Sequence, residues 1–135
     1  MGEGIVSIGK SESPENTAQN HLDTLYAYGH GEVLFKPTKA AKDQFRGTPE
    51  EALSYFVTGI VDEDKGFALA PYTDVRFENE GIVTDCDSAL AMGNYYFTTT
   101  QGQDIKAEYS FGYIKDEGGA LKINLHHSSL PYTAE

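Results

Sequence analysis

The residues best suited to proton chemistry lie together near the end of the chain: His126, His127, Ser128 and Ser129. The surrounding residues have the composition of a strand, in which successive side chains point to opposite faces. Counting alternate residues from Leu125 places His127 and Ser129 on the apolar inner face, and His126 and Ser128 on the outer face. A histidine and a serine on an apolar face are costly unless they are hydrogen-bonded or line a solvated pocket. The pattern predicts a site at His127 and Ser129, with a hydrogen-bonded core histidine as the alternative.

The histidines and cysteines form no metal-binding pattern. The spacings HxH, HxxxH and CxxC do not occur, and the other two histidines, His21 and His30, lie far away in the sequence. Because His126 and His127 point to opposite faces, they are poorly placed to bind one ion together. The single cysteine, Cys86, excludes an internal disulfide and a thiolate cluster. These spacings argue against a zinc enzyme, and a hard cation such as magnesium or manganese at a carboxylate cluster is the alternative.

Two further polar residues lie in apolar surroundings, Thr38 directly after Pro37 and Tyr55 within the run 52–57. On the residues alone, Thr38 is a turn or helix cap, and Tyr55 is a core aromatic whose hydroxyl reaches water. There is no GxSxG motif, so acyl hydrolysis is unsupported.

Two helix starts precede the predicted strands. Ser13 followed by Pro14 begins a helix that is predicted to continue to Gly29, and the stretch 1–12 before it is predicted to be flexible. Thr48 begins a second helix, to about Gly59, with Glu51 three residues later as in a capping box. Between the two helices, 33–36 is predicted to be extended because Pro37 disfavours helix before it.

After Gly66 the pattern is that of an antiparallel meander. Aromatic and β-branched runs are separated by turn residues at 79–81, 85–87, 101–103 and 116–119. Within 105–113 the odd-numbered residues, including Tyr109 and Phe111, are apolar or aromatic and predict the buried face. Helices followed by a meander predict a single α+β domain, 1–135, in which the N-terminal helices cover one face of a curved sheet.

The formal charge of −11 makes nucleic acid an improbable partner, since phosphate backbones are bound by clustered Lys and Arg. No apolar run approaches the length of roughly 18 to 20 residues that spans a bilayer, and the N-terminus lacks a signal pattern. We expect no membrane partner and a cytoplasmic protein, or one of an organelle lumen if a targeting segment has been removed.

Several blocks of the sequence together resemble the iota-class carbonic anhydrases. The most specific is 123–132, with the sequence INLHHSSLPY, and the others are 33–40, 52–57, 89–95 and 108–113. More distantly, the chain is similar to the association domain of calcium/calmodulin-dependent protein kinase. Both groups share the cone-shaped fold of the nuclear transport factor two-like (cystatin-like) superfamily, which agrees with the α+β layout above.

The resemblance implies reversible hydration of carbon dioxide to bicarbonate, without a metal in the algal and cyanobacterial branch. On this ground we expect no metal and no cofactor. Carried over by motif, the catalytic groups are Thr38, Tyr55, His127 and Ser129. We hypothesise that Thr38, Tyr55 and Ser129 bind the substrate, together with a cavity wall formed by Tyr109 and Phe111. His127 would accept or relay the proton, with Tyr55 as the alternative base if its pKa is depressed.

The resemblance leaves one alternative from another class, a non-catalytic association or small-ligand module on the same scaffold. It also implies a homodimer, because the outer sheet face of such cones commonly forms a dimer interface. The partners expected are therefore carbon dioxide or bicarbonate and a second copy of the chain.

Overall fold

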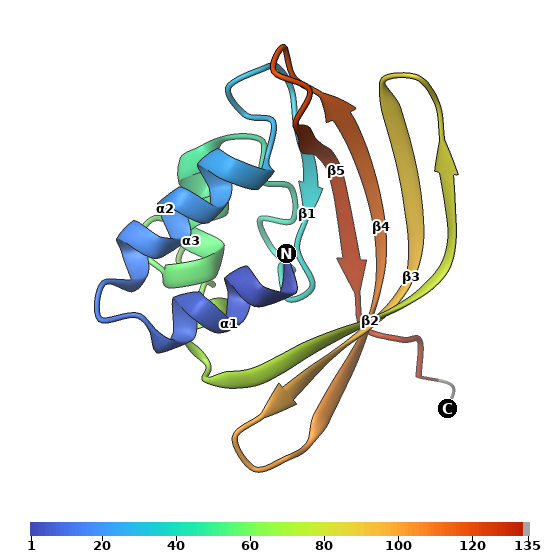
Figure 1. Ribbon diagram of the computed structural model, residues 1–135. Coiled ribbons are helices and arrows are strands. Elements are labelled where there is room, and N and C mark those ends of the chain that lie inside the picture. Colours follow the sequence, from blue (N-terminus) through green and yellow to red (C-terminus); the bar gives the residue numbers. More distant parts are fainter. Residues whose placement is uncertain (134–135) are drawn as a thin grey trace.

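A curved sheet carries the helices of this protein on one of its faces (Figure 1). The computed structural model describes residues 1–133. The helices are α1 (Gly2–Lys10), α2 (Pro14–Leu25) and α3 (Pro49–Val57), with a short 3-10 turn, η1 (Phe67–Leu69). The strands are β1 (Leu34–Lys36), β2 (Tyr72–Thr84), β3 (Ser88–Thr99), β4 (Asp104–Lys115) and β5 (Leu121–Ser129). This arrangement confirms the predicted α+β fold with helices packed on a curved sheet.

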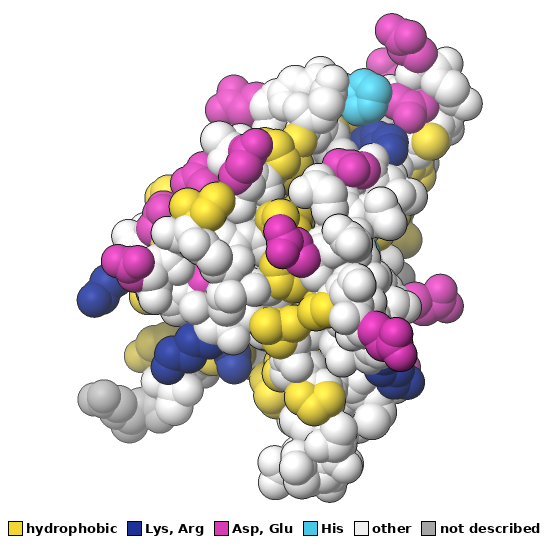
Figure 2. Space-filling model, turned by 90° about the vertical axis from the view of Figure 1, so that its left-hand side faces the viewer, with side chains coloured by type: hydrophobic (Ala, Val, Ile, Leu, Met, Phe, Trp, Pro, Cys, Tyr) yellow, Lys and Arg dark blue, Asp and Glu magenta, His cyan; other side chains and the backbone are white. Residues whose placement is uncertain are grey.

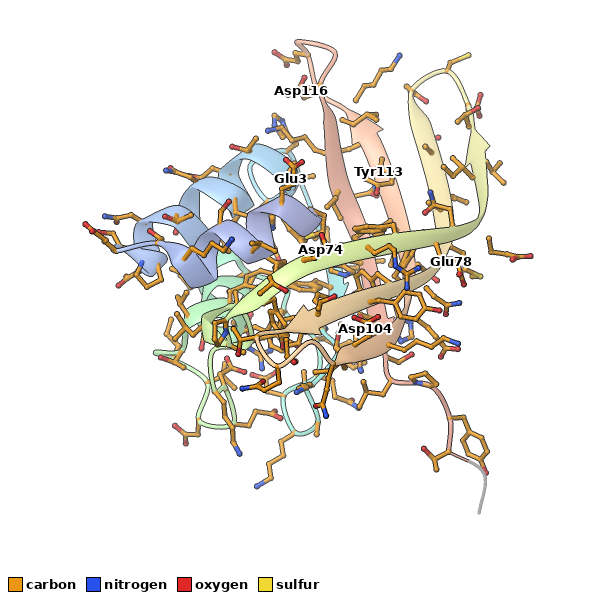
Figure 3. The ribbon with its side chains drawn as sticks, turned by 60° about the horizontal axis from the view of Figure 1, so that its bottom comes forward. Glu3, Asp74, Glu78, Asp104, Tyr113 and Asp116 are labelled. Carbon is orange, nitrogen blue, oxygen red and sulfur yellow. The ribbon has the colours of Figure 1, made fainter. Side chains whose placement is uncertain are left out.

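The five strands lie in the order β1-β5-β4-β3-β2. The pairs from β2 to β5 are antiparallel neighbours in sequence, as short connections require, whereas β1 pairs with β5 in parallel. Figure 3 looks at the sheet from below and shows the helices together on one side, with Asp116 at the tip of the β4–β5 connection. The last strand thus lies inside the sheet, between β1 and β4.

Helix α2 begins as predicted but ends at Leu25, before the predicted end at Gly29. Tyr26 has extended backbone angles and forms a parallel bridge with Ile123, and the N–H of Ala27 donates to the carbonyl of Ile123 at 2.8 Å. Sheet hydrogen bonds from β5 thus replace the helical ones, which an amphipathic pattern within the helix does not reveal. The side chain of Tyr26 is buried beside β5.

The stretch 1–12 contains helix α1, so the prediction of a flexible segment is wrong for residues 2–10. Ile5 and Ile8 are buried in the core. A Cβ placed on Gly4 would lie 2.1 Å from Nδ1 of His21, so the absence of a side chain allows α1 to approach α2 closely. The glycines that weaken the intrinsic helix propensity are therefore the residues that permit packing.

The N-terminus of α3 confirms the predicted cap. The side chain of Thr48 accepts a hydrogen bond from the N–H of Glu51 at 3.2 Å and donates to its carboxylate at 2.9 Å. This satisfies one of the free N–H groups of the first turn and fixes where α3 starts.

The predicted turn at 79–81 is instead a β-bulge inside β2, where the pairing with β3 shifts register. Gly93 lies opposite, and a Cβ there would be 2.3 Å from the carbonyl oxygen of Glu78, so the bulge requires glycine on the partner strand. Bulges increase twist, and a long strand that must curve around a core uses one. The other three predicted turns connect the strands, and the predicted alternation at 105–113 is confirmed by the burial of Ala107, Tyr109 and Phe111.

On the helical side of the surface, acidic side chains are more frequent than basic ones (Figure 2). Figure 2 shows Asp and Glu spread over this side, with fewer and scattered Lys and Arg. Among residues 1–133, no helix has the length and apolar composition needed to cross a membrane.

Candidate active site

A β-bulge in β5 decides which residues of the closing motif face the core. Gly112 of β4 pairs with Leu125 and Tyr113 pairs with Ile123, which leaves Asn124 as an extra residue without a partner. The alternation therefore slips by one after Ile123, and a slip of one residue moves every later side chain to the other face.

The inward orientation predicted for His127 and Ser129 is consequently wrong. His126 and Ser128 are buried, with 5% and 1% of their surfaces exposed, whereas His127 is exposed and Ser129 only half-buried. His127 and Ser129 border a shallow hollow on the outer face of the sheet. The sequence signal for the slip was Gly112, because a glycine inside a strand often marks a bulge; a Cβ there would lie 2.9 Å from the Cβ of Leu125.

His126 lies between two aromatic rings. In the sheet it stands opposite Phe35 of β1 and Phe111 of β4. The ring of Phe35 stacks on the imidazole at a centroid distance of 4.8 Å, and the ring of Phe111 lies at 4.3 Å. Burial lowers the pKa of His126 to about 3, so the imidazole is neutral at physiological pH.

A chain of hydrogen bonds runs through His126 to two hydroxyl groups. Nδ1 of His126 lies 2.7 Å from the hydroxyl of Tyr26, and Nε2 lies 3.2 Å from the hydroxyl of Tyr95. Tyr95 donates to Oγ of Ser128 at 2.5 Å, and Oγ of Ser128 is 2.5 Å from Oγ1 of Thr38. Residues from four segments that are distant in sequence thus form one polar network in an apolar core.

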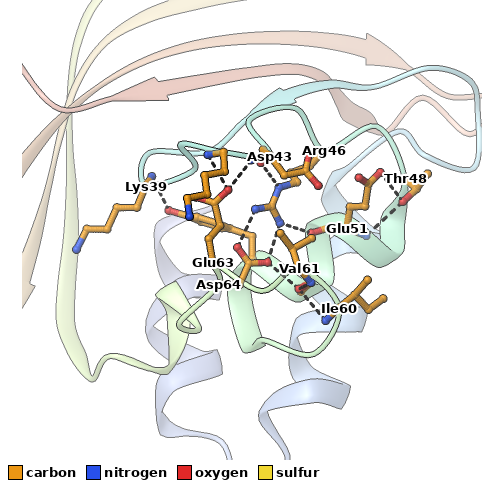
Figure 4. Close-up of polar contacts among 12 residues, drawn as sticks. Lys39, Asp43, Arg46, Thr48, Glu51, Ile60, Val61, Glu63 and Asp64 are labelled. Atoms are coloured by element: carbon orange, nitrogen blue, oxygen red, sulfur yellow. Dashed lines mark hydrogen bonds and ion pairs between the residues drawn. The ribbon is translucent and has the colours of Figure 1, made fainter.

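Tyr55 reaches the same region from α3. Its hydroxyl accepts a hydrogen bond from the backbone N–H of Lys39 at 3.2 Å, next to Thr38 (Figure 4). Burial raises the pKa of Tyr55 above its usual value and that of Tyr95 to about 12. Tyr55 therefore keeps its proton at neutral pH, and the direction of its pKa opposes the hypothesis that it acts as the base.

The position of α3 is fixed by a buried ion pair (Figure 4). The guanidinium of Arg46, fully buried, donates to both carboxylate oxygens of Asp64 at 2.7 Å, and Ser54 of α3 donates to the same carboxylate at 2.7 Å. Arg46 also donates to the carbonyl of Glu51 in the first turn of α3. Removal of one partner of such a pair leaves a buried charge, so the network holds Tyr55 in place.

The polar groups open onto a small cavity between the helices and the sheet. Its polar lining includes Thr38, Tyr55, Tyr95 and His126, and most of its remaining wall is apolar. The space open to the centres of water-sized molecules is about 20 Å³, and a single water requires roughly 10–15 Å³ on this measure. The cavity thus has room for only one or two small molecules.

Tyr109 and Phe111 do not line this cavity, so the predicted wall is wrong in detail. Both lie one layer behind it: the ring of Tyr109 is 5.2 Å from that of Tyr95, and Phe111 packs on His126. They support the residues that face the cavity. Tyr95 and Tyr26 were not predicted as site residues. Tyr95 ends the block 89–95 that resembles the family and Tyr26 belongs to no motif, but only the folded sheet brings their hydroxyls to His126.

Within residues 1–133, no group of three or more His, Cys, Asp or Glu side chains is arranged to hold a metal ion. The buried carboxylate of Asp64 is engaged by Arg46. The donors that surround the cavity are hydroxyl groups and one imidazole.

The architecture is that of a known fold. Helices packed on one face of a curved sheet form the fold of nuclear transport factor two-like proteins. A calcium/calmodulin-dependent protein kinase II association domain from Xanthomonas campestris superposes with a TM-score of 0.64 at 24% identity, covering 95% of this chain and 83% of that chain.

The family is more specific than the fold. The family model for metal-independent carbonic anhydrase matches residues 1–130, and the chain belongs to this family. A metal-independent carbonic anhydrase from Nostoc sp. (strain PCC 7120 / SAG 25.82 / UTEX 2576) is 40% identical, covering 97% of this chain and 68% of that protein. The crystal structure of an iota-carbonic anhydrase from a cyanobacterium, complexed with bicarbonate, has a TM-score of 0.94 at 37% identity, covering 98% of this chain and 87% of that chain.

Proposed function

We propose that this protein catalyses the reversible hydration of carbon dioxide in the cavity bordered by Thr38, Tyr55, Tyr95 and His126. Membership of the metal-independent carbonic anhydrase family supports this reaction, as does the similarity to an enzyme solved with bicarbonate. The observation that carries the assignment is the pair of hydroxyls, Thr38 and Ser128, 2.5 Å apart at one end of a hydrogen-bonded chain beside a space large enough only for small molecules.

The groups proposed for catalysis differ from the sequence prediction at two positions and include Tyr95 in addition. Thr38 and Tyr55 are retained, while His126 and Ser128 replace His127 and Ser129. The roles first predicted for His127 and Ser129 required an inward orientation, and in the structure His126 and Ser128 have that orientation.

The pKa values around the cavity favour a reaction that charges no side chain. Burial lowers the pKa of His126 to about 3, while it raises those of Tyr55 and Tyr95. None of these three groups readily accepts or loses a proton alone at neutral pH. A hydroxyl that accepts one proton while it donates another avoids this cost, because its charge does not change.

We therefore propose a relay through the hydroxyl of Thr38. The oxygen of a bound water forms a bond to the carbon of carbon dioxide and gives one proton to Oγ1 of Thr38. The original hydroxyl proton of Thr38 passes to an oxygen of carbon dioxide as one C=O π bond breaks. The product is carbonic acid, which loses its proton to solvent to give bicarbonate. Ser128 holds Thr38 in place, and Tyr55 and Tyr95 orient the reactants in a small, mostly apolar space.

Stopped-flow measurement of carbon dioxide hydration on chelator-treated protein tests this proposal. We expect activity without added metal, a fall of about 100-fold in kcat for Thr38→Val and for Ser128→Ala, and little change for the outer-face control Ser129→Ala. Between pH 6 and 9 we expect no change in kcat from the titration of His126, Tyr55 or Tyr95, because burial moves the pKa values of all three groups out of this range. Wild-type activity in both inner variants, or activity that requires added metal, would contradict the proposal.

We further propose that the chain forms a homodimer through the outer face of its sheet. Leu90 and Met92 are exposed on β3, on the face opposite the buried Tyr95. Such exposed apolar side chains are expected at an interface. Light scattering should give twice the mass of the chain, and Met92→Lys should lower it. An inactive, larger ring would instead support the association-module alternative.

A further inference from the structure

We propose that Tyr26 is a positioning residue for the hydration reaction: its hydroxyl donates to Nδ1 of His126 and thereby keeps the imidazole proton on Nε2, toward Tyr95. Tyr26 does not line the cavity, so it acts through His126 rather than on the reactants. The inference rests on the proposed function for its kinetic consequence, but the tautomer itself is observable without any activity.

The direction of the hydrogen-bond chain follows from its geometry. Tyr95 uses its single hydrogen to donate to Ser128, so its oxygen is free only to accept, and Nε2 of His126 is placed to donate to it at 3.2 Å. A neutral imidazole carries one N–H, so Nδ1 must then be an acceptor. The hydroxyl of Tyr26, 2.7 Å away, supplies the donor.

The opposite direction is poorly satisfied. If Nδ1 carried the proton, the hydrogen of Tyr26 would need another acceptor. Among residues 1–133, the other acceptor near this hydroxyl is the sulfur of Met1 at 4.0 Å, and a thioether is a weak acceptor. The imidazole is also neutral, because burial lowers its pKa to about 3. The hydrogen bonds of His126 with Tyr26 and with Tyr95 therefore favour the same tautomer, with the proton on Nε2.

Two irregularities of the backbone bring Tyr26 and His126 together. The early end of α2 turns the chain into a bridge with Ile123, which places Tyr26 beside β5. The extra residue Asn124 then turns His126 inward. With regular structure at either place, the two side chains would not meet.

The tautomer of His126 affects the reaction through the last hydrogen bond of the network, between Ser128 and Thr38. With the proton order Tyr26 to His126 to Tyr95 to Ser128, the hydrogen of Ser128 is directed to Oγ1 of Thr38. The hydrogen of Thr38 is then not used toward Ser128 and remains on the side of Tyr55, Tyr95 and the cavity, where the proposed relay uses it. If both imidazole tautomers are populated, the hydrogen bonds from Tyr26 to Thr38 run in both directions. Only the protein molecules with the proton on Nε2 of His126 then have the Thr38 hydroxyl oriented for the relay.

Nitrogen-15 spectroscopy of the histidine rings tests the inference on the wild-type protein, with the His126 signals identified by their loss in His126→Gln. We expect Nε2 to be protonated and Nδ1 to have the shift of a hydrogen-bonded acceptor. Protonation of Nδ1 in the wild type would overturn the inference whether or not the protein is active.

Tyr26→Phe is the matching kinetic variant, with Tyr28→Phe as its control. The ring of Tyr28 stacks on that of Tyr26, and its hydroxyl donates a hydrogen bond to the carbonyl of Arg46. Tyr28→Phe therefore also removes a tyrosine hydroxyl with an internal partner, but one outside the hydrogen-bond chain through His126. We expect Tyr26→Phe to show mixed tautomer signals and a fall in kcat of about 3- to 10-fold with KM little changed. Tyr28→Phe should keep the wild-type tautomer and kcat.

Equal kinetic effects in the two variants, with an unchanged tautomer, would show a merely structural role for Tyr26. An inactive wild type with the expected tautomer would count against the proposed function alone.

Discussion

The two faces of β5 carry the same residue types in the same order but have different environments. His126 and Ser128 lie in the core, where each has hydrogen-bond partners among buried hydroxyls. His127 and Ser129 lie one residue further on and border an open hollow on the outer face. Each pair consists of a histidine and a serine, so both have the same functional groups. Environment separates them, since burial neutralises His126 and holds its ring nitrogens in fixed contacts.

The largest expected difference between the faces is in activity. His126→Asn should lower kcat for carbon dioxide hydration by about 100-fold, because the amide cannot reproduce both ring contacts and the chain to Ser128 is broken. His127→Asn should change it by less than about 2-fold. Stopped-flow assays of both variants, with circular dichroism to confirm folding, make the comparison. A larger loss of kcat in His127→Asn than in His126→Asn would indicate that the active site lies on the outer face of the sheet.

The bulge that separates the faces should be sensitive to substitution at Gly112. In Gly112→Ala the new Cβ would meet Asn124 and Leu125 at 2.9 Å, so the strand pair must shift. We expect a loss of about 1–3 kcal/mol in the free energy of unfolding. Gly47→Ala is the control, because a Cβ there meets nothing within 4 Å. Denaturant titrations that give equal stabilities for the two variants would show that the bulge does not depend on glycine.

The buried histidines should make the folded protein sensitive to acid. Burial lowers the pKa of His126 to about 3 and that of His21 to about 4, against about 6.5 in the unfolded chain. The unfolded state therefore binds more protons as the pH falls below 6.5, and stability is lost in that direction. Each group contributes a slope of about 1.4 kcal/mol per pH unit between pH 6 and 5.

Urea titrations over this pH range measure the slope. His126→Asn should remove one group's share of that slope. A slope that is the same in the wild type and in His126→Asn would mean that His126 is not neutral in the folded protein.

The sequence by itself determined the features that depend on neighbouring residues. Thr48 caps α3 through Glu51, and Pro14 opens α2, because these interactions involve residues within one turn of the helix. The alternation at 105–113 identified the buried face of β4 because that strand keeps a regular period of two through this segment. The motif 123–132 also indicated the family, and the family model confirms it.

Only the tertiary structure decided which residues of that motif face the cavity. The end of α2 at Leu25 depends on hydrogen bonds to Ile123, about a hundred residues later in the chain. The bulge at Asn124 depends on the space opposite Gly112 in the neighbouring strand. Both are contacts between distant segments, and local periodicity contains no information about them. For this reason the sequence identified the histidine pair and its chemistry, while the packing of β5 between β1 and β4 selected His126.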